Sequence, residues 1–327
     1  MIRVIVEIGA RAAPVAYVVR GDVVESVHHG HLVALDGQGA QAITAGDPDV
    51  TFFPRSSLKP VQAVAMLRTG LDLSGELLAL AAASHGGERA HLDGVRRILD
   101  GAGLRVDDLQ NTPDLPLDLP AATCWRAEQR PPSPLAQNCS GKHAAMLATC
   151  RVAGWDTAAY LDPGHPLQRA VRETVEDLTG VPVERIAVDG CGAPLFSSTP
   201  AGLARAFALI ATAPPETPEG RVATALRDHP WWVAGTDRDV VRLTAAVPGL
   251  IAKDGAEGVF AAALPDGRAV VLKVLDGAVR PVRAVVAAAL RALGVDEPGL
   301  AAAGHTAVLG HGVPVGCVEP VLGPSAG

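Results

Sequence analysis

The chain has 327 residues, a net charge of −7 at pH 7 and 48% hydrophobic residues, of which very few are aromatic. This length suits one large domain or two smaller ones that share a site. The negative charge, and basic runs no longer than a pair, argue against nucleic-acid binding. Residues 1–7 carry charges and no long apolar run, so we expect no signal peptide, no membrane span and a cytoplasmic location.

Residues 1–53 are expected to form strands and turns. The segment 15–24 is rich in β-branched residues and is broken by Gly21-Asp22. From Pro54 the pattern changes to helix, and a first helix that begins near Ser56 must accommodate Pro60. Apolar periodicity predicts further helices, separated by a proline-rich connection over 111–136. These helices are expected over 76–84, 89–100, 142–152, 166–178 and 200–213.

The last part of the chain returns to strands. Residues 258–264 and 268–275 flank Pro265-Asp266-Gly267, which is a strong hairpin signal, and an Ala/Val-rich helix is expected over 280–293. This order predicts an α+β fold with an antiparallel sheet built from both chain ends and an inserted helical region. We expect residues 1–327 to form a single catalytic unit, with a sheet part (1–53 and 245–327), a mainly helical part (54–244) and a site between them.

Two serine motifs are candidates for nucleophilic chemistry. Ser56 precedes Lys59 by three residues, which places both side chains on one face of a helix. A lysine whose pKa is lowered can take the proton of a serine, although the pattern also occurs by chance on protein surfaces. Ser84 ends an apolar run before His85-Gly86-Gly87, where the alternative is an ordinary helix C-cap.

Two of the five cysteines lie in loops of small residues with other metal-binding side chains nearby. Cys139 belongs to Asn138-Cys139-Ser140-Gly141-Lys142-His143, and Cys191 belongs to Asp189-Gly190-Cys191-Gly192. Thiolates and imidazoles are zinc ligands, and the alternative is a pair of buried free thiols. The odd number of cysteines, without tight spacing, does not indicate a disulfide framework.

A further lysine, Lys253, stands in Lys253-Asp254-Gly255 before the predicted hairpin. A lysine at this place can face a cleft between sheet and helices, as in the Lys-Thr-Gly strand of penicillin-binding enzymes. A solvated turn lysine is the alternative.

Together, five motifs resemble the asparaginase II family, the rhizobial-type thermolabile L-asparaginases. The match runs in order from Pro54 to the last predicted helix, and Gln137 departs from the asparagine expected there. The motifs are Arg55-Ser56-Ser57-Leu58-Lys59-Pro60, Ala83-Ser84-His85, Cys139-Ser140-Gly141-Lys142-His143, Asp189-Gly190-Cys191-Gly192-Ala193-Pro194 and Lys253-Asp254-Gly255-Ala256-Glu257-Gly258. The resemblance implies a fold similar to serine β-lactamases and glutaminases.

The resemblance also implies roles. Ser56 with Lys59 and Ser84 with Lys253 look like two catalytic Ser-Lys pairs. Arg55, His85 and Asp189 look like substrate-binding residues. Cys139, Lys142 and Cys191 look like ligands of a Zn²⁺ ion, with Asp189 and His143 nearby, and Lys142 would have to bind as the neutral amine.

We therefore expect an enzyme that hydrolyses L-asparagine to aspartate and ammonia through an acyl-enzyme, with possible weak glutaminase activity, and that forms a homodimer. In this scheme Lys59 deprotonates Ser56, and Ser84 with Lys253 moves further protons. Two rivals stay open. One is a β-lactamase-like acyltransferase or esterase, and the other is a non-catalytic relative that binds zinc or a small molecule.

Overall fold

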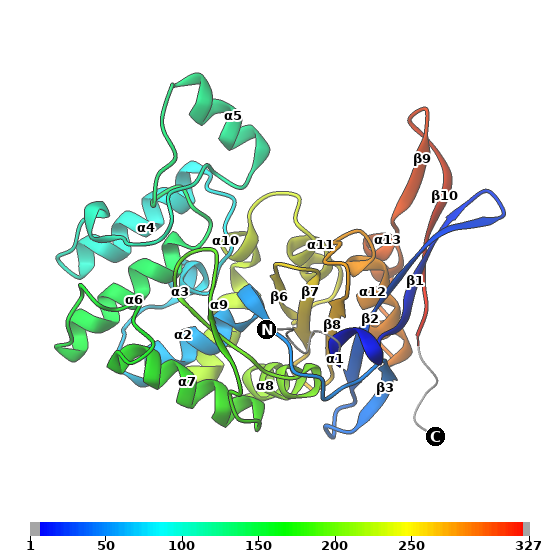
Figure 1. Ribbon diagram of the computed structural model, residues 1–327, viewed down its shortest axis with the longest axis horizontal. Coiled ribbons are helices and arrows are strands. Elements are labelled where there is room, and N and C mark those ends of the chain that lie inside the picture. The colour runs from blue at the N-terminus through cyan, green and yellow to red at the C-terminus, as the bar shows by residue number, and fades with distance from the viewer. Residues whose placement is uncertain (1–6, 323–327) are drawn as a thin grey trace, which may run out of the picture.

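The computed structural model describes residues 7–322, so the segment behind the expectation of no signal peptide lies mostly outside the described residues. One antiparallel sheet has the order β6-β7-β8-β2-β1-β10-β9, with β3 paired to β2. Its strands are β1 (Ala13–Arg20), β2 (Val23–Leu35), β3 (Gln41–Ala45), β6 (Ile251–Gly255), β7 (Val259–Ala263), β8 (Ala269–Val274), β9 (Ala307–Gly310) and β10 (Val313–Pro320). Both chain ends contribute to it, which confirms the predicted α+β class (Figure 1).

Along the chain, the helices come mostly between the N-terminal strands β1–β3 and the C-terminal strands β6–β10. They are α1 (Glu7–Ala10), α2 (Lys59–Arg68), α3 (Gly75–Ala81), α4 (Arg89–Gly101), α5 (Leu119–Ala127), α6 (Ser140–Ala153), α7 (Pro166–Thr179), α8 (Pro200–Thr212), α9 (Pro218–Asp228), α10 (Pro230–Ala234), α11 (Asp239–Ala246), α12 (Val282–Ala292) and α13 (Leu300–Gly304). Two short 3₁₀ helices, η1 (Arg55–Leu58) and η2 (Val106–Asp108), and a small hairpin of β4 (Ile186–Val188) and β5 (Pro194–Phe196) complete the chain.

The centre of the sheet is covered on both faces. All six residues of β8 are buried, which requires apolar cover on each side of the strand. Helix α8 packs on β2, β7 and β8, and α12 packs on β8, β7 and β10. The helical part lies beside this sheet, with α2 to α7 away from the paired hairpins β1–β2 and β9–β10 (Figure 1).

The segment around Ser56 avoids the conflict that Pro60 would create inside a helix. Residues 55–58 form η1, and α2 begins at Lys59, whose backbone N–H donates to the Ser56 carbonyl. Pro60 then falls in the first turn of α2, where its missing N–H costs no helical hydrogen bond. The change from η1 to α2 thus lets Ser56 and Lys59 occupy consecutive short elements.

Two parts of the chain differ from the expectation. The proline-rich connection contains a helix, α5, because the Asp118 carboxylate accepts from the Ala121 N–H and Pro120 occupies the first turn. The proline-rich connection over 111–136 therefore carries a helix that the sequence did not predict. After the closing helix α12, the chain adds the hairpin β9–β10, which pairs with β1. Among residues 7–322, no helix is both long and apolar enough to cross a bilayer.

Candidate active site

A pocket of about 450 Å³ lies where the helical part meets the sheet. Both candidate nucleophiles line it. Its wall combines polar side chains with an apolar side made of Leu117, Phe260 and Val279 among others. The polar and charged lining residues include Ser56, Ser84, Asn138, Arg238, Asp239 and Asp254.

Ser56 lies on a tightly held turn. The preceding residue, Arg55, has a φ of 56°, in the left-handed region that is costly for a residue other than glycine. The next residue, Ser57, is fully buried and donates to the Pro54 carbonyl at 2.7 Å. A Cβ at Gly255 would lie 2.6 Å from the same carbonyl, so only glycine lets β6 approach η1 this closely. These constraints hold Ser56 at the pocket and turn Ser57 away from it.

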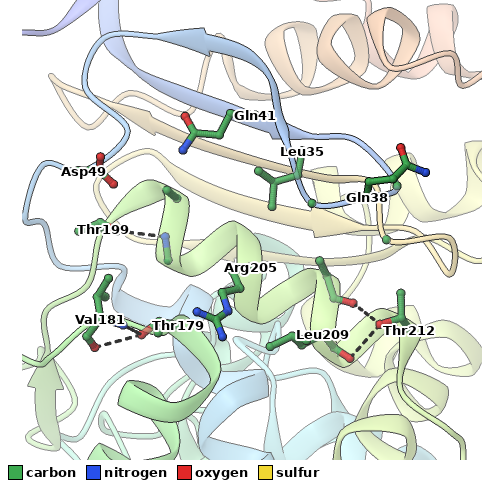
Figure 2. Close-up of a pocket in the computed structure, with 17 residues that line it drawn as sticks. Leu35, Gln38, Gln41, Asp49, Thr179, Val181, Thr199, Arg205, Leu209 and Thr212 are labelled. Carbon is green, nitrogen blue, oxygen red and sulfur yellow. Dashed lines mark hydrogen bonds between the residues drawn. The ribbon is translucent and has the colours of Figure 1, made fainter. Parts of the chain in front are cut away.

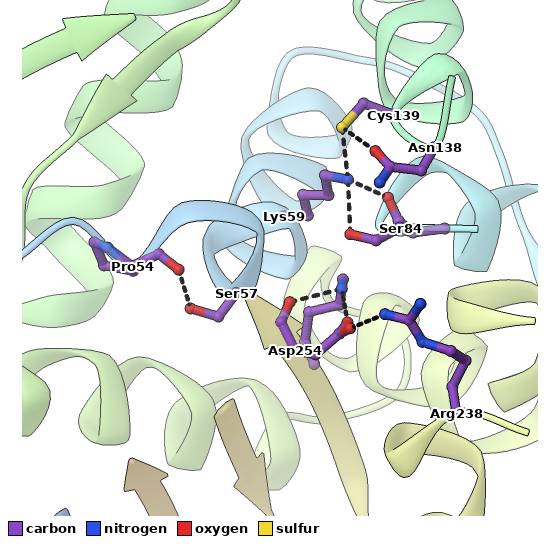
Figure 3. A network of polar contacts seen from close by, with 10 residues as sticks. Pro54, Ser57, Lys59, Ser84, Asn138, Cys139, Arg238 and Asp254 are labelled. Carbon is purple, nitrogen blue, oxygen red and sulfur yellow. Dashed lines mark hydrogen bonds and ion pairs between the residues drawn. The ribbon is translucent and has the colours of Figure 1, made fainter. Parts of the chain in front are cut away.

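Lys59 is buried, and its side-chain nitrogen contacts the loop after α3 and the residue before α6. Its Nζ donates to the Ala83 carbonyl and to Ser84 Oγ at 3.0 Å, and it lies 3.1 Å from Cys139 Sγ (Figure 3). The resemblance implied that Lys59 serves Ser56 and that Lys253 serves Ser84. In the structure the lysine bonded to Ser84 is Lys59.

Lys253 is fully buried at the end of the sheet. Its Nζ contacts the Asp254 carboxylate and donates to the Asp254 carbonyl at 2.7 Å. The Asp254 carboxylate also accepts from Arg238 Nη2 at 2.7 Å (Figure 3). Burial, together with the positive charges of Lys59 and Arg238, lowers the pKa of Lys253 to about 8 against the attraction of Asp254. An amine with such a pKa is partly neutral near neutral pH and can accept a proton.

The Asp254 carboxylate stays charged in this setting. Burial disfavours the charge, but Lys253 and Arg238 hold the pKa of Asp254 well below its usual value. Asp254 therefore joins a lysine at the sheet edge to an arginine at the start of α11.

The two candidate metal-binding thiols come together. Cys139 and Cys191 are buried and belong to one small cluster with Ala193. A hydrogen bond from Cys191 lowers the pKa of the Cys139 thiol well below its usual value, helped by the positive charges of Lys59 and Lys142. Lys142 Nζ lies 3.2 Å from Cys191 Sγ. The two thiols thus contact each other, and each is also contacted by one lysine, Cys139 by Lys59 and Cys191 by Lys142.

This donor set fits a zinc ion in composition, since it offers two thiols and an amine in one buried place. Within residues 7–322, no group of three or more His, Cys, Asp or Glu side chains gathers as a metal site, so Lys142 would have to be the third ligand. Burial opposes the charge of Lys142, but Cys191, Cys139 and Asp189 raise its pKa. A bound cation would have to reverse that balance and release the proton of Lys142.

The three expected substrate-binding residues have different surroundings. Arg55 Nε donates to Asp189 Oδ1 at 2.8 Å, and both are partly buried. His85 is fully buried, and its Nε2 lies 2.9 Å from the Ser140 hydroxyl. Because that hydroxyl donates to the Leu135 carbonyl, His85 Nε2 is the donor of this pair. None of these three lines the pocket that Ser56 and Ser84 share.

Sequence reasoning missed the charged residues at the start of α11. Arg238 and Asp239 line the pocket, and Asp237 before them has a φ of 57°. The signal in the sequence was only a short charged run after Gly235. Nothing in such a run distinguishes a helix start on the surface from one that faces a pocket.

A second pocket of about 440 Å³ lies between α8 and the β2–β3 hairpin (Figure 2). Its lining includes Arg205, Gln41 and Thr199 but none of the predicted site residues. The pocket with Ser56 and Ser84 is therefore the candidate active site.

Comparison with known proteins gives one family. The family model described as L-asparaginase II matches residues 16–320. No curated protein matches the chain.

Several solved structures resemble the chain at low identity. A β-lactamase from Mycobacterium bovis is 16% identical, with a TM-score of 0.47 over 81% of this chain and 94% of that one. Mglu in its Tris and glutamate form is 19% identical, with a TM-score of 0.36 over 78% of this chain and 57% of that one. A Bacillus glutaminase is 14% identical, with a TM-score of 0.34 over 76% of this chain and 83% of that one. At such scores none of the three bears on the reaction of this chain.

Proposed function

Because the chain belongs to the L-asparaginase II family, we propose that it hydrolyses L-asparagine to L-aspartate and ammonia. Membership supports a hydrolase that acts on an amide, and the choice of asparagine is our proposal. The observation that carries it is the shared pocket: Ser56 and Ser84 both line it, and the buried amine of Lys59 is bonded to Ser84.

The reaction that we propose is acyl transfer to Ser56. Lys59, as the neutral amine, takes the proton of Ser56, whose Oγ attacks the side-chain amide carbon of asparagine. Protonated Lys59 returns this proton to the amide nitrogen, the C–N bond breaks and ammonia leaves, and water then hydrolyses the acyl-enzyme. Backbone N–H groups at the start of η1 are available to stabilise the oxyanion.

Ser84 and Lys253 supply the second proton route in this scheme. Ser84 accepts from Lys59 Nζ at 3.0 Å and lines the pocket, so it can relay a proton between Ser56, Lys59 and the leaving group. Lys253, with a pKa of about 8, is the base best suited to the water that attacks the acyl-enzyme.

We also propose a Zn²⁺ ion held by Cys139, Lys142 and Cys191. When bound, the ion would lock the two loops that carry the thiols and help to orient the substrate, since the serines and lysines already provide a nucleophile and bases. Cys139 lies 3.1 Å from Lys59 Nζ, so an ordered Cys139 loop also keeps Lys59 in place.

A homodimer is part of the proposal. Large apolar side chains are exposed on the paired hairpins β1–β2 and β9–β10, which project from one end of the molecule (Figure 1). Clustered apolar exposure of this kind is typical of a surface that another chain covers. These residues are Val23, Val24, Val27, Leu309, Val313 and Val315.

The test is an ammonia assay with L-asparagine, L-glutamine and a chromogenic β-lactam, each with and without added zinc. We expect release of ammonia from asparagine, weaker release from glutamine and no turnover of the β-lactam. One extra methylene changes binding by only about 1–3 kcal/mol, so glutamine is disfavoured but not rejected. Turnover of the β-lactam alone would favour the β-lactamase-like acyltransferase or esterase. Turnover of none of the three compounds would favour a non-catalytic relative.

A further inference from the structure

The pocket shared by the two serines carries a pair of opposite charges that the reaction scheme does not use. Arg238 and Asp239 line it from the start of α11, across from the serines' own elements. Ser56 and Ser84 account for the chemistry at the amide carbon. They leave open what holds the rest of the substrate.

The guanidinium group of Arg238 is held in place by one contact and keeps further N–H donors for a ligand. Its Nη2 donates to Asp254 Oδ2 at 2.7 Å, which anchors the guanidinium to the sheet edge. A guanidinium has five N–H donors in a rigid fork. Its side chain is 35% exposed in a wall of the pocket, so donors remain for a second carboxylate.

Asp239 forms no ion pair with another residue of the described part of the chain, 7–322. It is half-buried and, among residues 7–322, has no basic side-chain nitrogen within 4 Å. Burial raises its pKa despite the more distant charges of Arg283 and Arg238. Its neighbour Asp237 also lines the pocket, but the Asp237 carboxylate already pairs with Arg242. A half-buried, unpaired carboxylate on a pocket wall is stabilised by a cation that enters the pocket.

We propose that Arg238 and Asp239 form the subsite for the α-carboxylate and the α-ammonium of an L-α-amino acid. This inference rests on the proposed function and names its substrate class as a zwitterionic amino acid whose side-chain amide faces the serines. Arg238 binds the carboxylate, and Asp239 binds the ammonium. Arg55, His85 and Asp189 do not line this pocket, so the subsite proposed here does not include them.

Asp239 also has a simpler explanation, since an acidic residue in the first turn of a helix interacts favourably with the helix dipole. That role affects stability but not the choice between ligands. The test must therefore compare ligands that differ by one charged group.

The experiment measures binding of three product-like ligands to the full-length protein by isothermal titration calorimetry. They are L-aspartate, succinate, which lacks the ammonium, and β-alanine, which lacks the α-carboxylate. We expect the wild type to bind L-aspartate about tenfold to a hundredfold more tightly than either, as one charge-assisted hydrogen bond provides. Asp239→Asn should remove the preference over succinate, and Arg238→Met the preference over β-alanine.

Arg221→Met is the matched control for the loss of an arginine, because Arg221 lies on α9 and pairs with Asp72, and neither residue lines the pocket. It should keep both preferences. The inference is overturned if the wild type shows no preference, if it binds none of the three ligands, or if each variant weakens all three ligands equally. Circular dichroism of each variant confirms folding, and Asp239→Asn conserves size should Arg238→Met fail to fold.

The outcome separates this inference from the proposed function. Discrimination that depends on Asp239 and Arg238, without ammonia release from L-asparagine, supports the subsite and removes the asparaginase. Ammonia release without that discrimination supports the asparaginase and overturns the subsite.

Discussion

Ser56 and Ser57 are adjacent hydroxyls with opposite surroundings. Ser57 is buried and its hydroxyl donates a hydrogen bond to the Pro54 carbonyl, whereas Ser56 lines the pocket. The left-handed backbone conformation of Arg55 fixes the direction of the Ser56 side chain that follows it. The two hydroxyls therefore cannot exchange places unless η1 unwinds. The proposal of Ser56 as the nucleophile therefore depends on its neighbours as much as on its own chemistry.

Ser56→Ala should lower kcat for L-asparagine by about 10³-fold or more while the protein stays folded, because the acyl-enzyme cannot form. Ammonia release measures the rate, and circular dichroism the fold. Ser57→Ala is the matched control. It should retain the rate and lose about 1 kcal/mol of stability with its hydrogen bond to Pro54. The reverse pattern, with Ser57 essential and Ser56 dispensable, would remove our assignment.

The pH dependence of the rate should follow Lys253. Its pKa is about 8, and it accepts a proton only when neutral, so kcat should rise as the pH increases from 6 through 8 to a plateau. Asp254→Asn removes the charge that favours protonated Lys253, so its pKa falls and the rise moves to lower pH. A rate optimum near pH 5 in the wild type would indicate carboxylate chemistry and would contradict the scheme.

Two loops from distant parts of the chain meet at the thiols. Cys139 stands directly before α6, and Cys191 stands in the turn between β4 and β5. Gly141 lets α6 approach α3, because a Cβ there would lie 2.4 Å from the Leu80 carbonyl. Close packing of these elements brings Lys142 to Cys191 and Lys59 to Cys139. The proposed metal site therefore depends on the contact between helices as well as on the residues proposed as ligands.

We expect close to one zinc per chain when the wild type is purified without chelator and supplied with zinc. Cys139→Ser and Cys191→Ser should each lose most of the metal and raise KM more than they lower kcat, because we assign zinc a positioning role. Cys317→Ser, remote in the chain on β10, is the control and should retain the metal. Plasma mass spectrometry measures the metal content.

Two outcomes would correct this view. A wild type that binds no zinc under these conditions leaves two core thiols and no metal site. Variants that lose kcat with KM unchanged would give zinc a direct part in the chemical step.

The sheet is covered by helices at its centre but not at the ends of its long hairpins. Its middle strands are covered by helices, but the hairpins β1–β2 and β9–β10 extend beyond this cover and expose valines (Figure 1). Val23 is 61% exposed and Val313 is 58% exposed. Strands that project with apolar residues are typical sites of association.

The protein should therefore migrate as a dimer, at twice the 33.5 kDa of one chain, in size-exclusion chromatography with light scattering. Val23→Glu combined with Val313→Glu should yield monomers, because burying two carboxylates without partners is costly. Val152→Glu, exposed at the end of α6, is the control and should remain dimeric. A wild-type monomer at micromolar concentration would refute the dimer.

The sequence by itself determined the class of the fold and the types of residue that the site contains. Periodicity and turn signals are local, so the order of strands, helices and the hairpin around 265–267 could be predicted before any contact was known. The motifs around Ser56, Ser84, Cys139 and Lys253 likewise carry their chemistry in a few adjacent residues. The helix α5 was missed because capping by Asp118 outweighed the many prolines nearby.

Only the tertiary structure decided which of these groups meet. The sequence motif paired Lys59 with Ser56, but in the structure Lys59 donates a hydrogen bond to Ser84. Arg238, at the start of a helix that belongs to no recognised motif, donates to Asp254. Such contacts depend on how elements far apart in the chain pack, within a few tenths of an ångström, and on which side chain is buried. A sequence pattern reports the periodicity of a single helix or strand. It carries no information on where a second helix or strand packs against the first.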